Sequence, residues 1–137
     1  MKFYVVKNRK TNLFWNGSKK GFKKNAKPWS HFGHLILALR QLDIIGKTLD
    51  DLRKYFGENC DILLIDLDNC EIYVNDFYWR IYRELKYNNQ LALQHSIKNQ
   101  DNTKLGICEI CQRITQLRDL FADVTNNRVV CKKCIEV

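Results

Sequence analysis

Long apolar runs are missing from this chain of 137 residues. No run approaches the roughly 18 residues that cross a bilayer, so we expect no membrane-spanning segment. The start, MKFYVVKNRK, holds only four consecutive apolar residues, too few for a secretory signal. We therefore expect a cytoplasmic protein, whose six cysteines are reduced and serve as metal ligands or buried thiols rather than disulfides.

Acidic residues are absent from the first forty positions, which carry ten Lys or Arg. The first acid is Asp43, whereas residues 41–101 have a net charge of −4 and residues 102–137 a net charge of +2. The overall charge of +8 therefore belongs mainly to one end of the chain. Such asymmetry favours a polyanionic or acidic partner for that end.

The apolar pattern mixes strands and helices. Ser30 is the expected N-cap of the first helix, and Thr48 with Asp51 approximates a capping box for the second. For residues 77–82, a strand after a turn at 75–76 is the alternative to a helix. We expect strands near 3–6, 13–15, 26–29, 61–67 and 71–74, and helices near 31–42, 48–56 and 77–97. The strand at 26–29 should lie at a sheet edge, because Pro28 cannot donate to a ladder.

Four cysteines near the C-terminus form two Cys-x-x-Cys pairs separated by nineteen residues. Each pair can form a tight knuckle, and two knuckles supply the four sulfur ligands of a tetrahedral Zn²⁺ site. Such a site leaves no position for water, so it is structural rather than catalytic. A redox dithiol or iron–sulfur ligation is the alternative. The predicted ligands of one structural zinc ion are Cys108, Cys111, Cys131 and Cys134.

The segment between the knuckles predicts a β-hairpin, with strands at 113–117 and 128–130 and a turn near 125–127. A unit of about thirty residues cannot fold on core burial alone, so the metal must supply much of its stability. The polar stretch 98–104 reads as a linker. We therefore expect an α+β domain over 1–100, with a small antiparallel sheet and two or three helices, and a zinc-ribbon module over 104–137.

The stretch from Ile107 to Ile135 resembles the four-cysteine zinc fingers of the DksA and TraR transcription regulators. The shared features are the Cys108-Glu109-x-Cys111 knuckle, an Ile114…Arg118 stretch and the closing Val130-Cys131-x-x-Cys134. The loop is slightly longer than in that family, and no long coiled coil precedes it. The resemblance implies a zinc fold, and RNA polymerase as a partner.

The first 75 residues or so resemble small uncharacterised proteins of tailed bacteriophages. The matching residues are Tyr4-Val5-Val6-Lys7-Asn8, Thr11-x-Leu13-Phe14-Trp15-x-Gly17, Ala26-Lys27 and Gly33-His34, followed by an apolar strand at 62–65. No activity comes with this resemblance. It implies a phage origin and a role in the cytoplasm of an infected bacterium.

The strands at 3–6 and 13–15 are expected to form a β-hairpin, and a basic loop over residues 16–30 links this hairpin to the first predicted helix. Lysines neutralise phosphates and aromatic faces stack on unpaired bases, so a loop with both suits single-stranded nucleic acid or RNA. The alternative is a solvated lysine loop whose tryptophans belong to the core, and an acidic protein surface would suit the same charge. The candidate nucleic-acid-binding residues are Lys19, Lys20, Lys23, Lys24 and Lys27 with Trp15, Phe22 and Trp29.

Three other groups are less specific as functional sites. A histidine pair lacks a third ligand, two cysteines flank a strand and read as buried thiols, and three aspartates lack a nuclease-like His or Lys nearby. No Gly-rich phosphate loop and no GxSxG motif is present. The three groups are His31 with His34, Cys60 with Cys70, and Asp66 with Asp68 and Asp76.

The function expected from these features is binding rather than catalysis. The first hypothesis is a phage-encoded accessory protein that binds nucleic acid or a ribonucleoprotein through the basic loop, with the zinc module as a second contact. The second is a host-takeover or anti-defence protein that binds and inhibits a bacterial complex, such as RNA polymerase or an immune effector. A small metal-dependent nuclease is the third.

Overall fold

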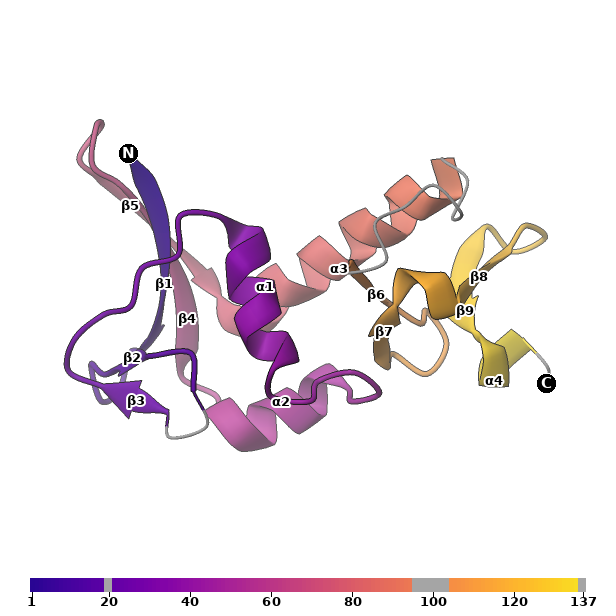
Figure 1. The fold of residues 1–137 in the computed structure, drawn as a ribbon, viewed down its shortest axis with the longest axis horizontal. Helices are drawn as coiled ribbons and strands as arrows, with labels where there is room; N and C mark the ends of the chain where they lie inside the picture. The colour runs from indigo at the N-terminus through magenta and orange to yellow at the C-terminus, as the bar shows by residue number, and fades with distance from the viewer. Residues whose placement is uncertain (19–20, 95–103, 136–137) are drawn as a thin grey trace. The chain divides into compact units, whose positions relative to one another are not determined.

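The computed structural model describes residues 1–18, 21–94 and 104–135 (Figure 1). The chain divides into two compact units. Unit 1 comprises Met1–Ile44 and Leu52–Arg80, and unit 2 comprises Ile45–Asp51 and Ile81–Val137. The fold class is α+β, as expected from the sequence, with a five-stranded antiparallel sheet in unit 1 and two small hairpins in unit 2.

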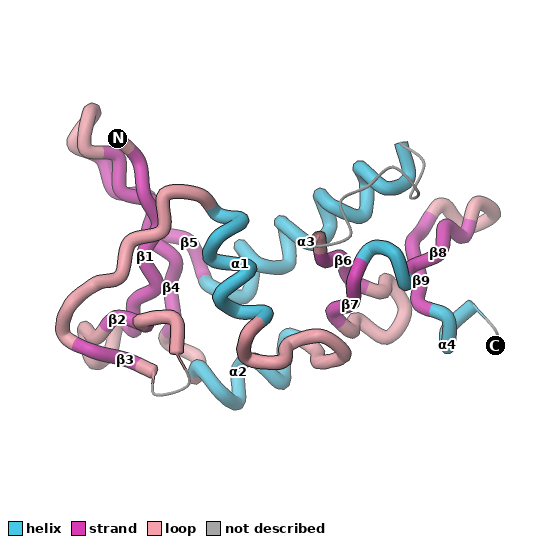
Figure 2. Tube along the Cα trace, in the orientation of Figure 1, coloured by secondary structure: helices cyan, strands magenta, loops and turns pink. Residues whose placement is uncertain are grey.

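The sheet of unit 1 has the order β3-β2-β1-β4-β5. β1 and β4 form its centre, paired along their whole length from Lys2 opposite Asp66 to Asn8 opposite Cys60. The strand expected near 61–67 is β4, and β5 returns beside it at the edge (Figures 1 and 2). The strands are β1 (Lys2–Asn8), β2 (Phe14–Trp15), β3 (Phe22–Lys23), β4 (Cys60–Asp66) and β5 (Glu71–Asp76).

The expected first hairpin is confirmed, because β1 pairs with β2. The expected strand at residues 26–29 is wrong: the third strand is β3, and Trp29 forms only an isolated bridge to Tyr4, with N···O distances of 2.8 and 2.9 Å. Gly21, with φ +82°, turns the chain early enough for β3 to pair with β2. Pro28 then precludes a regular ladder around Trp29.

The helices of the described residues are α1 (Phe32–Arg40), α2 (Leu49–Phe56), α3 (Phe77–Gln94) and α4 (Lys132–Ile135). Ser30 is not the N-cap of α1, because the helix begins one residue later and His31 takes that position without a side-chain hydrogen bond. The capping box of α2 is confirmed, since Thr48 and Asp51 exchange side-chain to backbone bonds of 2.9 and 3.2 Å.

Residues 77–82 are helical, so the alternative strand is wrong. Asp76 caps the start of this helix, because its carboxylate accepts hydrogen bonds from the backbone N–H groups of Tyr78 and Trp79 at 3.1 and 3.0 Å. These bonds satisfy donors that the first turn of a helix leaves unpaired. The last three residues of the expected helix, 95–97, lie outside the described residues.

Aromatic rings build the core of unit 1. Trp15 is fully buried and stacks on Trp29, with ring centroids 5.5 Å apart. Phe56 at the end of α2 meets Trp15 edge-on at 5.3 Å and Phe77 at 4.8 Å. Phe22 of β3 also meets Phe56 edge-on. One aromatic cluster therefore joins the end of α2 and the start of α3 to the short strands β2 and β3, and such offset and edge-on geometries stabilise it.

Unit 2 contains two hairpins rather than the single expected one (Figure 2). β6 (Leu105–Ile107) pairs with β7 (Ile114–Gln116), and β8 (Leu120–Asp123) pairs with β9 (Arg128–Cys131). The expected turn at 125–127 does connect β8 to β9, but residues 113–117 do not pair with 128–130. The reason is local: the first knuckle is itself the turn of the β6–β7 hairpin, closed by a 3.0 Å bond from Cys108 N–H to the Arg113 carbonyl.

Two buried asparagines join the second half of α3 to β6. The Asn89 amide donates to the Ile107 carbonyl at 2.7 Å and accepts from the Ile107 N–H at 3.1 Å. Asn88 donates to the Leu105 carbonyl at 2.8 Å. Units 1 and 2 therefore divide the chain differently from the expected domains 1–100 and 104–137, because α3 from Ile81 onward belongs to unit 2 with the cysteine hairpins. Residues 98–103 of the expected linker lie outside the described part of the chain.

Candidate metal centre

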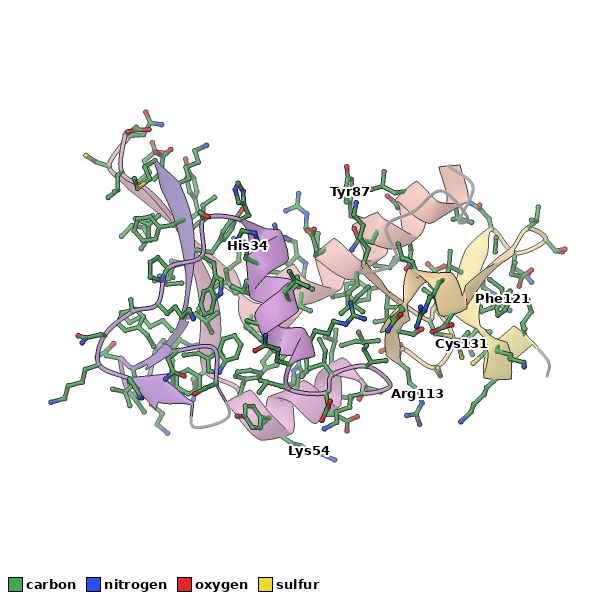
Figure 3. The ribbon with its side chains drawn as sticks, in the orientation of Figure 1. His34, Lys54, Tyr87, Arg113, Phe121 and Cys131 are labelled. Carbon is green, nitrogen blue, oxygen red and sulfur yellow. The ribbon has the colours of Figure 1, made fainter. Side chains whose placement is uncertain are left out.

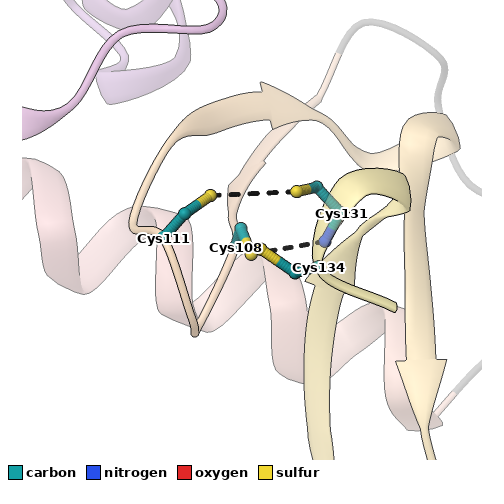
Figure 4. A group of neighbouring side chains, drawn as sticks. All are labelled: Cys108, Cys111, Cys131 and Cys134. Carbon is teal, nitrogen blue, oxygen red and sulfur yellow. Dashed lines mark hydrogen bonds between the residues drawn. The ribbon is translucent and has the colours of Figure 1, made fainter. Parts of the chain in front are cut away.

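The sulfur atoms of Cys108, Cys111, Cys131 and Cys134 lie within 4.8 Å of one another and could hold a metal ion (Figure 4). The Cys111 and Cys131 sulfurs are 3.8 Å apart. A tetrahedral zinc site with Zn–S bonds of about 2.3 Å has sulfurs about 3.8 Å apart, so this separation already matches one edge of the tetrahedron. The donor set fits the chemistry of a closed, four-sulfur metal site.

The first two ligands belong to the turn between β6 and β7. The Gln112 N–H donates to the Cys108 carbonyl at 2.9 Å, and the left-handed φ of Gln112, +61°, then turns the chain back toward β7. The tight turn directs both thiols of the pair to one point. A left-handed residue is the usual cost of such a reversal for any residue other than glycine.

The last two ligands come from the end of β9 and the first turn of α4. Cys131 closes the strand, and its backbone N–H donates to the Cys108 sulfur at 3.3 Å. Cys134 follows three residues later on α4, which brings its thiol back toward the same point. Figure 4 shows the two pairs facing one another, and Figure 3 places Cys131 beside α4.

Glu109, inside the first knuckle, fastens it to β9 and α3. Its backbone N–H donates to the Val129 carbonyl at 2.9 Å, while its carboxylate accepts from the Val129 N–H and pairs with Lys86 of α3. Such partners around the ligands hold the thiols in place before any ion binds. The resemblance to the DksA and TraR fingers included this glutamate, but no local pattern in the sequence predicts its partners.

The thiols differ in acidity because their surroundings differ. Burial raises the pKa of Cys108, but hydrogen bonds from the backbone N–H groups of Cys111, Cys131 and Ile110 outweigh it and lower the pKa to about 6. Burial and the neighbouring thiols raise the pKa of Cys134 to about 12. Cys108 is therefore a thiolate near neutral pH, and the thiolate is the form that binds metal.

A small apolar cluster supports the site from one side. It contains Leu117, Leu120, Val129 and Val130 with Cys108. The other three cysteines lie against this cluster. Leu117 belongs to the short 3₁₀ helix η2 (Leu117–Asp119). This cluster is one part of the core of unit 2, which also buries Ile81, Leu85, Leu105, Ile107 and Ile114. Around the cysteines themselves the apolar side chains are few, so bound metal would add to the folding free energy there.

The basic loop between β2 and α1 is only partly as expected. Lys23, Lys24 and Lys27 are exposed, whereas Lys19 and Lys20 lie outside the described residues. Phe22 is half-buried and meets Phe56 edge-on. Stacking of bases on the two tryptophans is wrong for this structure, because Trp15 is fully buried and Trp29 is only 6% exposed.

None of the three less specific groups forms a metal cluster within the described residues. Within the described ranges, the four-cysteine cluster is the only group of three or more His, Cys, Asp or Glu side chains placed to hold an ion. Asp66 and Asp76 bind a turn and a helix start, and Asp68 pairs with the chain's N-terminus. His31, the N-cap of α1, and His34 in its first turn are exposed neighbours. Figure 3 shows His34 on α1.

The two remaining cysteines do not approach each other across the hairpin. Cys60 begins β4 and is buried, and Cys70 lies in the turn after β4 and is exposed. The expectation of buried thiols therefore holds for Cys60 and is wrong for Cys70. Burial raises the pKa of Cys60 to about 12, with the carboxylates of Asp61 and Asp76 adding to the shift.

Comparisons with protein-family models, with curated proteins and with solved structures found no match. Neither resemblance noted in the sequence gains or loses support from them. In the described parts of the chain, no helix has the length and apolar character needed to cross a membrane.

Proposed function

We propose that this protein is a non-enzymatic nucleic-acid-binding protein in which exposed lysines of unit 1 contact phosphates and a zinc ion stabilises unit 2. The single observation behind the proposal is the one-sided charge, with ten basic residues and no acid in the first forty positions. The proposed ligand is single-stranded RNA or DNA, or a ribonucleoprotein. The proposed setting is the cytoplasm of a phage-infected bacterium, as the N-terminal resemblance implies.

The exposed lysines are available for such contacts. Lys10, Lys23, Lys24 and Lys27 are exposed and form no ion pair with any residue that the structure describes. By contrast, the β1 base Lys2 faces Asp66 at 3.9 Å, and Arg9 pairs with Asp61 at 2.6 Å. Lys2 and Arg9 are thus partly neutralised inside the protein, while Lys10, Lys23, Lys24 and Lys27 are left to an external anion.

The buried tryptophans change the expected mode of binding from stacking to charge. The Trp15 indole donates to the Ser18 carbonyl at 3.0 Å, and the Lys27 ammonium lies 5.8 Å from the centre of the Trp29 ring. The aromatic cluster therefore positions the loop that carries the lysines. Phosphate contacts of this kind bring affinity with little sequence preference.

Zinc is the metal that we propose for the four-cysteine site. Four thiolates within tetrahedral reach match the closed structural sites of Zn²⁺. Its role in this proposal is to hold the two hairpins of unit 2, since the four sulfur ligands leave no open position for catalysis.

The test is binding of a fluorescein-labelled 20-nucleotide RNA or DNA strand, measured by anisotropy over a range of salt concentrations. Replacing Lys23, Lys24 and Lys27 by alanine removes three cations, each of which contributes about 0.7 to the logarithmic salt slope. We expect the slope to fall by about 2 and affinity to drop at low salt. The charge-matched control replaces Lys47, Lys54 and Lys104, which are exposed elsewhere.

Equal losses in the two triple variants would contradict a specific role for the loop, and no binding to either strand would contradict the proposal. A bacterial partner retained from lysate after nuclease treatment, with no binding to the labelled strands, would instead favour an acidic protein complex as the target of the same lysines.

A further inference from the structure

The outer edge of β5 is an unprotected sheet edge. β5 ends the sheet order, and among the described residues no strand pairs with its outer side. In an antiparallel sheet, alternate residues of an edge strand direct their N–H and C=O groups away from the neighbouring strand. Natural edges are usually protected by lysine, proline or a bulge. The sequence of β5, EIYVND, has no lysine or proline, and its pairing with β4 runs unbroken from Glu71 to Asp76.

Apolar side chains are exposed on both faces of this edge. Ile72 and Val74 share one face and are 61% and 63% exposed, while Tyr73 on the other face is 47% exposed. Adjacent exposed apolar groups of this kind mark interaction sites more often than isolated ones do. Together with the open backbone edge, they match the requirements for an added strand, in which main-chain bonds give affinity and alternate side chains give specificity.

The charge of the segment that contains β5 is opposite to that of the basic loop. Residues 55–79 contain six acids and no Lys or Arg. Asp61, Asp66 and Asp68 pair with Arg9, Lys2 and the N-terminal ammonium, which lie on β1 or next to its ends. β1 pairs with the side of β4 opposite to β5. Glu71 and Asp76 flank the apolar centre of β5 at its two ends. An added strand would be stabilised most by basic residues at its ends, opposite Glu71 and Asp76, and by apolar residues between them.

A second copy of the chain does not fit this edge. In the antiparallel register that pairs all six residues of β5 with β5 of a second copy, each Glu71 would face an Asp76. Like charges directly opposite in a sheet are destabilising. We propose that the outer edge of β5 docks an extended, basic and apolar segment of a partner protein, which adds a strand to the sheet.

The test uses a labelled peptide, KFYVVKN, whose sequence is that of β1 and which has lysines flanking an apolar centre. Anisotropy with the full-length, zinc-loaded protein should show saturable binding. The matched peptide EFYVVEN should bind roughly tenfold more weakly, since two favourable charge pairs become two repulsive ones. Two further peptides, N-methylated at alternate residues, separate strand addition from side-chain binding: only one set of amides faces β5, so only one of them should lose binding.

Two protein variants complete the test. Ile72→Lys puts a cation on the edge and should weaken KFYVVKN binding at least tenfold. The control, Leu67→Lys, changes another exposed apolar residue outside the strand and should stay within twofold of the unchanged protein. Circular dichroism would check that both fold. The proposal is overturned by no saturable binding of KFYVVKN up to millimolar concentration, by equal binding of the lysine and glutamate peptides, or by full binding of both methylated peptides. A protein that sediments as a dimer only when Ile72 is unchanged would also overturn it, in favour of a second copy.

Discussion

The two asparagines of α3 offer a sharp test of how unit 2 is held together. Asn89 is 1% exposed and forms two hydrogen bonds with the backbone of Ile107. Asn89→Ala leaves a buried N–H and a buried C=O without partners, and each such loss costs about 1–3 kcal/mol. We expect a destabilisation of about 3 kcal/mol, equivalent to roughly a hundredfold change in an opening equilibrium.

Amide hydrogen exchange of the zinc-loaded protein reads this change directly. The reporter is the Cys108 amide, because its bond to the Arg113 carbonyl at 3.0 Å is untouched by the mutation. Its exchange should become roughly a hundredfold faster in Asn89→Ala. Asn88→Ala removes a single bond and should cost about 1 kcal/mol. Exposed Gln90 provides the control, with an expected effect within about 0.5 kcal/mol. Equal exchange in Asn89→Ala and Gln90→Ala would refute the role of the asparagines.

Three further predictions concern single side chains. Gln112→Gly relieves a left-handed residue and should stabilise the knuckle by about 0.5–1 kcal/mol; competition with a zinc-binding dye would show tighter metal binding, and weaker binding would contradict this. The Asn69 amide, with Lys2 nearby, lowers the pKa of Asp66 against the opposing effect of burial. The ionised Asp66 carboxylate should therefore stabilise the fold above about pH 4, and this stabilisation should be lost as the pH falls. Urea unfolding followed by tryptophan fluorescence should therefore show Asp66→Asn destabilised at pH 7 and matching the unchanged protein at low pH; a constant difference would be contrary. In native, zinc-loaded protein, iodoacetamide should label exposed Cys70 and spare buried Cys60, as peptide mass mapping would show, and rapid labelling of Cys60 would contradict its burial.

Local patterns predicted the elements whose signals lie within a few residues. The Thr48–Asp51 capping box, the turn at 125–127 and the helix after Asp76 are set by hydrogen bonds to neighbours two or three residues away. The Cys-x-x-Cys spacing likewise predicted the four-cysteine cluster, because each knuckle is formed by its own backbone. Periodicity and capping residues are informative at this range.

Pairings between distant segments were not predictable in the same way. By their apolar pattern, residues 113–117 can pair equally well with 105–107 or with 128–130. The turn formed by the first knuckle brings them beside β6. The burial of Trp15 and Trp29 depends on their contact with each other and on the contact of Trp15 with Phe56, which is distant in the sequence. The bonds of Asn88 and Asn89 to β6 cross a separation of 17 and 18 residues, and polar residues in a helix give no sequence signal of such a role.

Native mass spectrometry of the purified protein most directly tests the central proposal, that Cys108, Cys111, Cys131 and Cys134 hold one structural zinc ion. We expect the mass of one zinc ion on the folded chain, retained in Cys70→Ser and lost, together with the protection of the Cys108 amide, in Cys111→Ser. A metal-free chain whose unit 2 is folded and protected, or a zinc ion that stays bound in Cys111→Ser with unchanged affinity, would contradict the account.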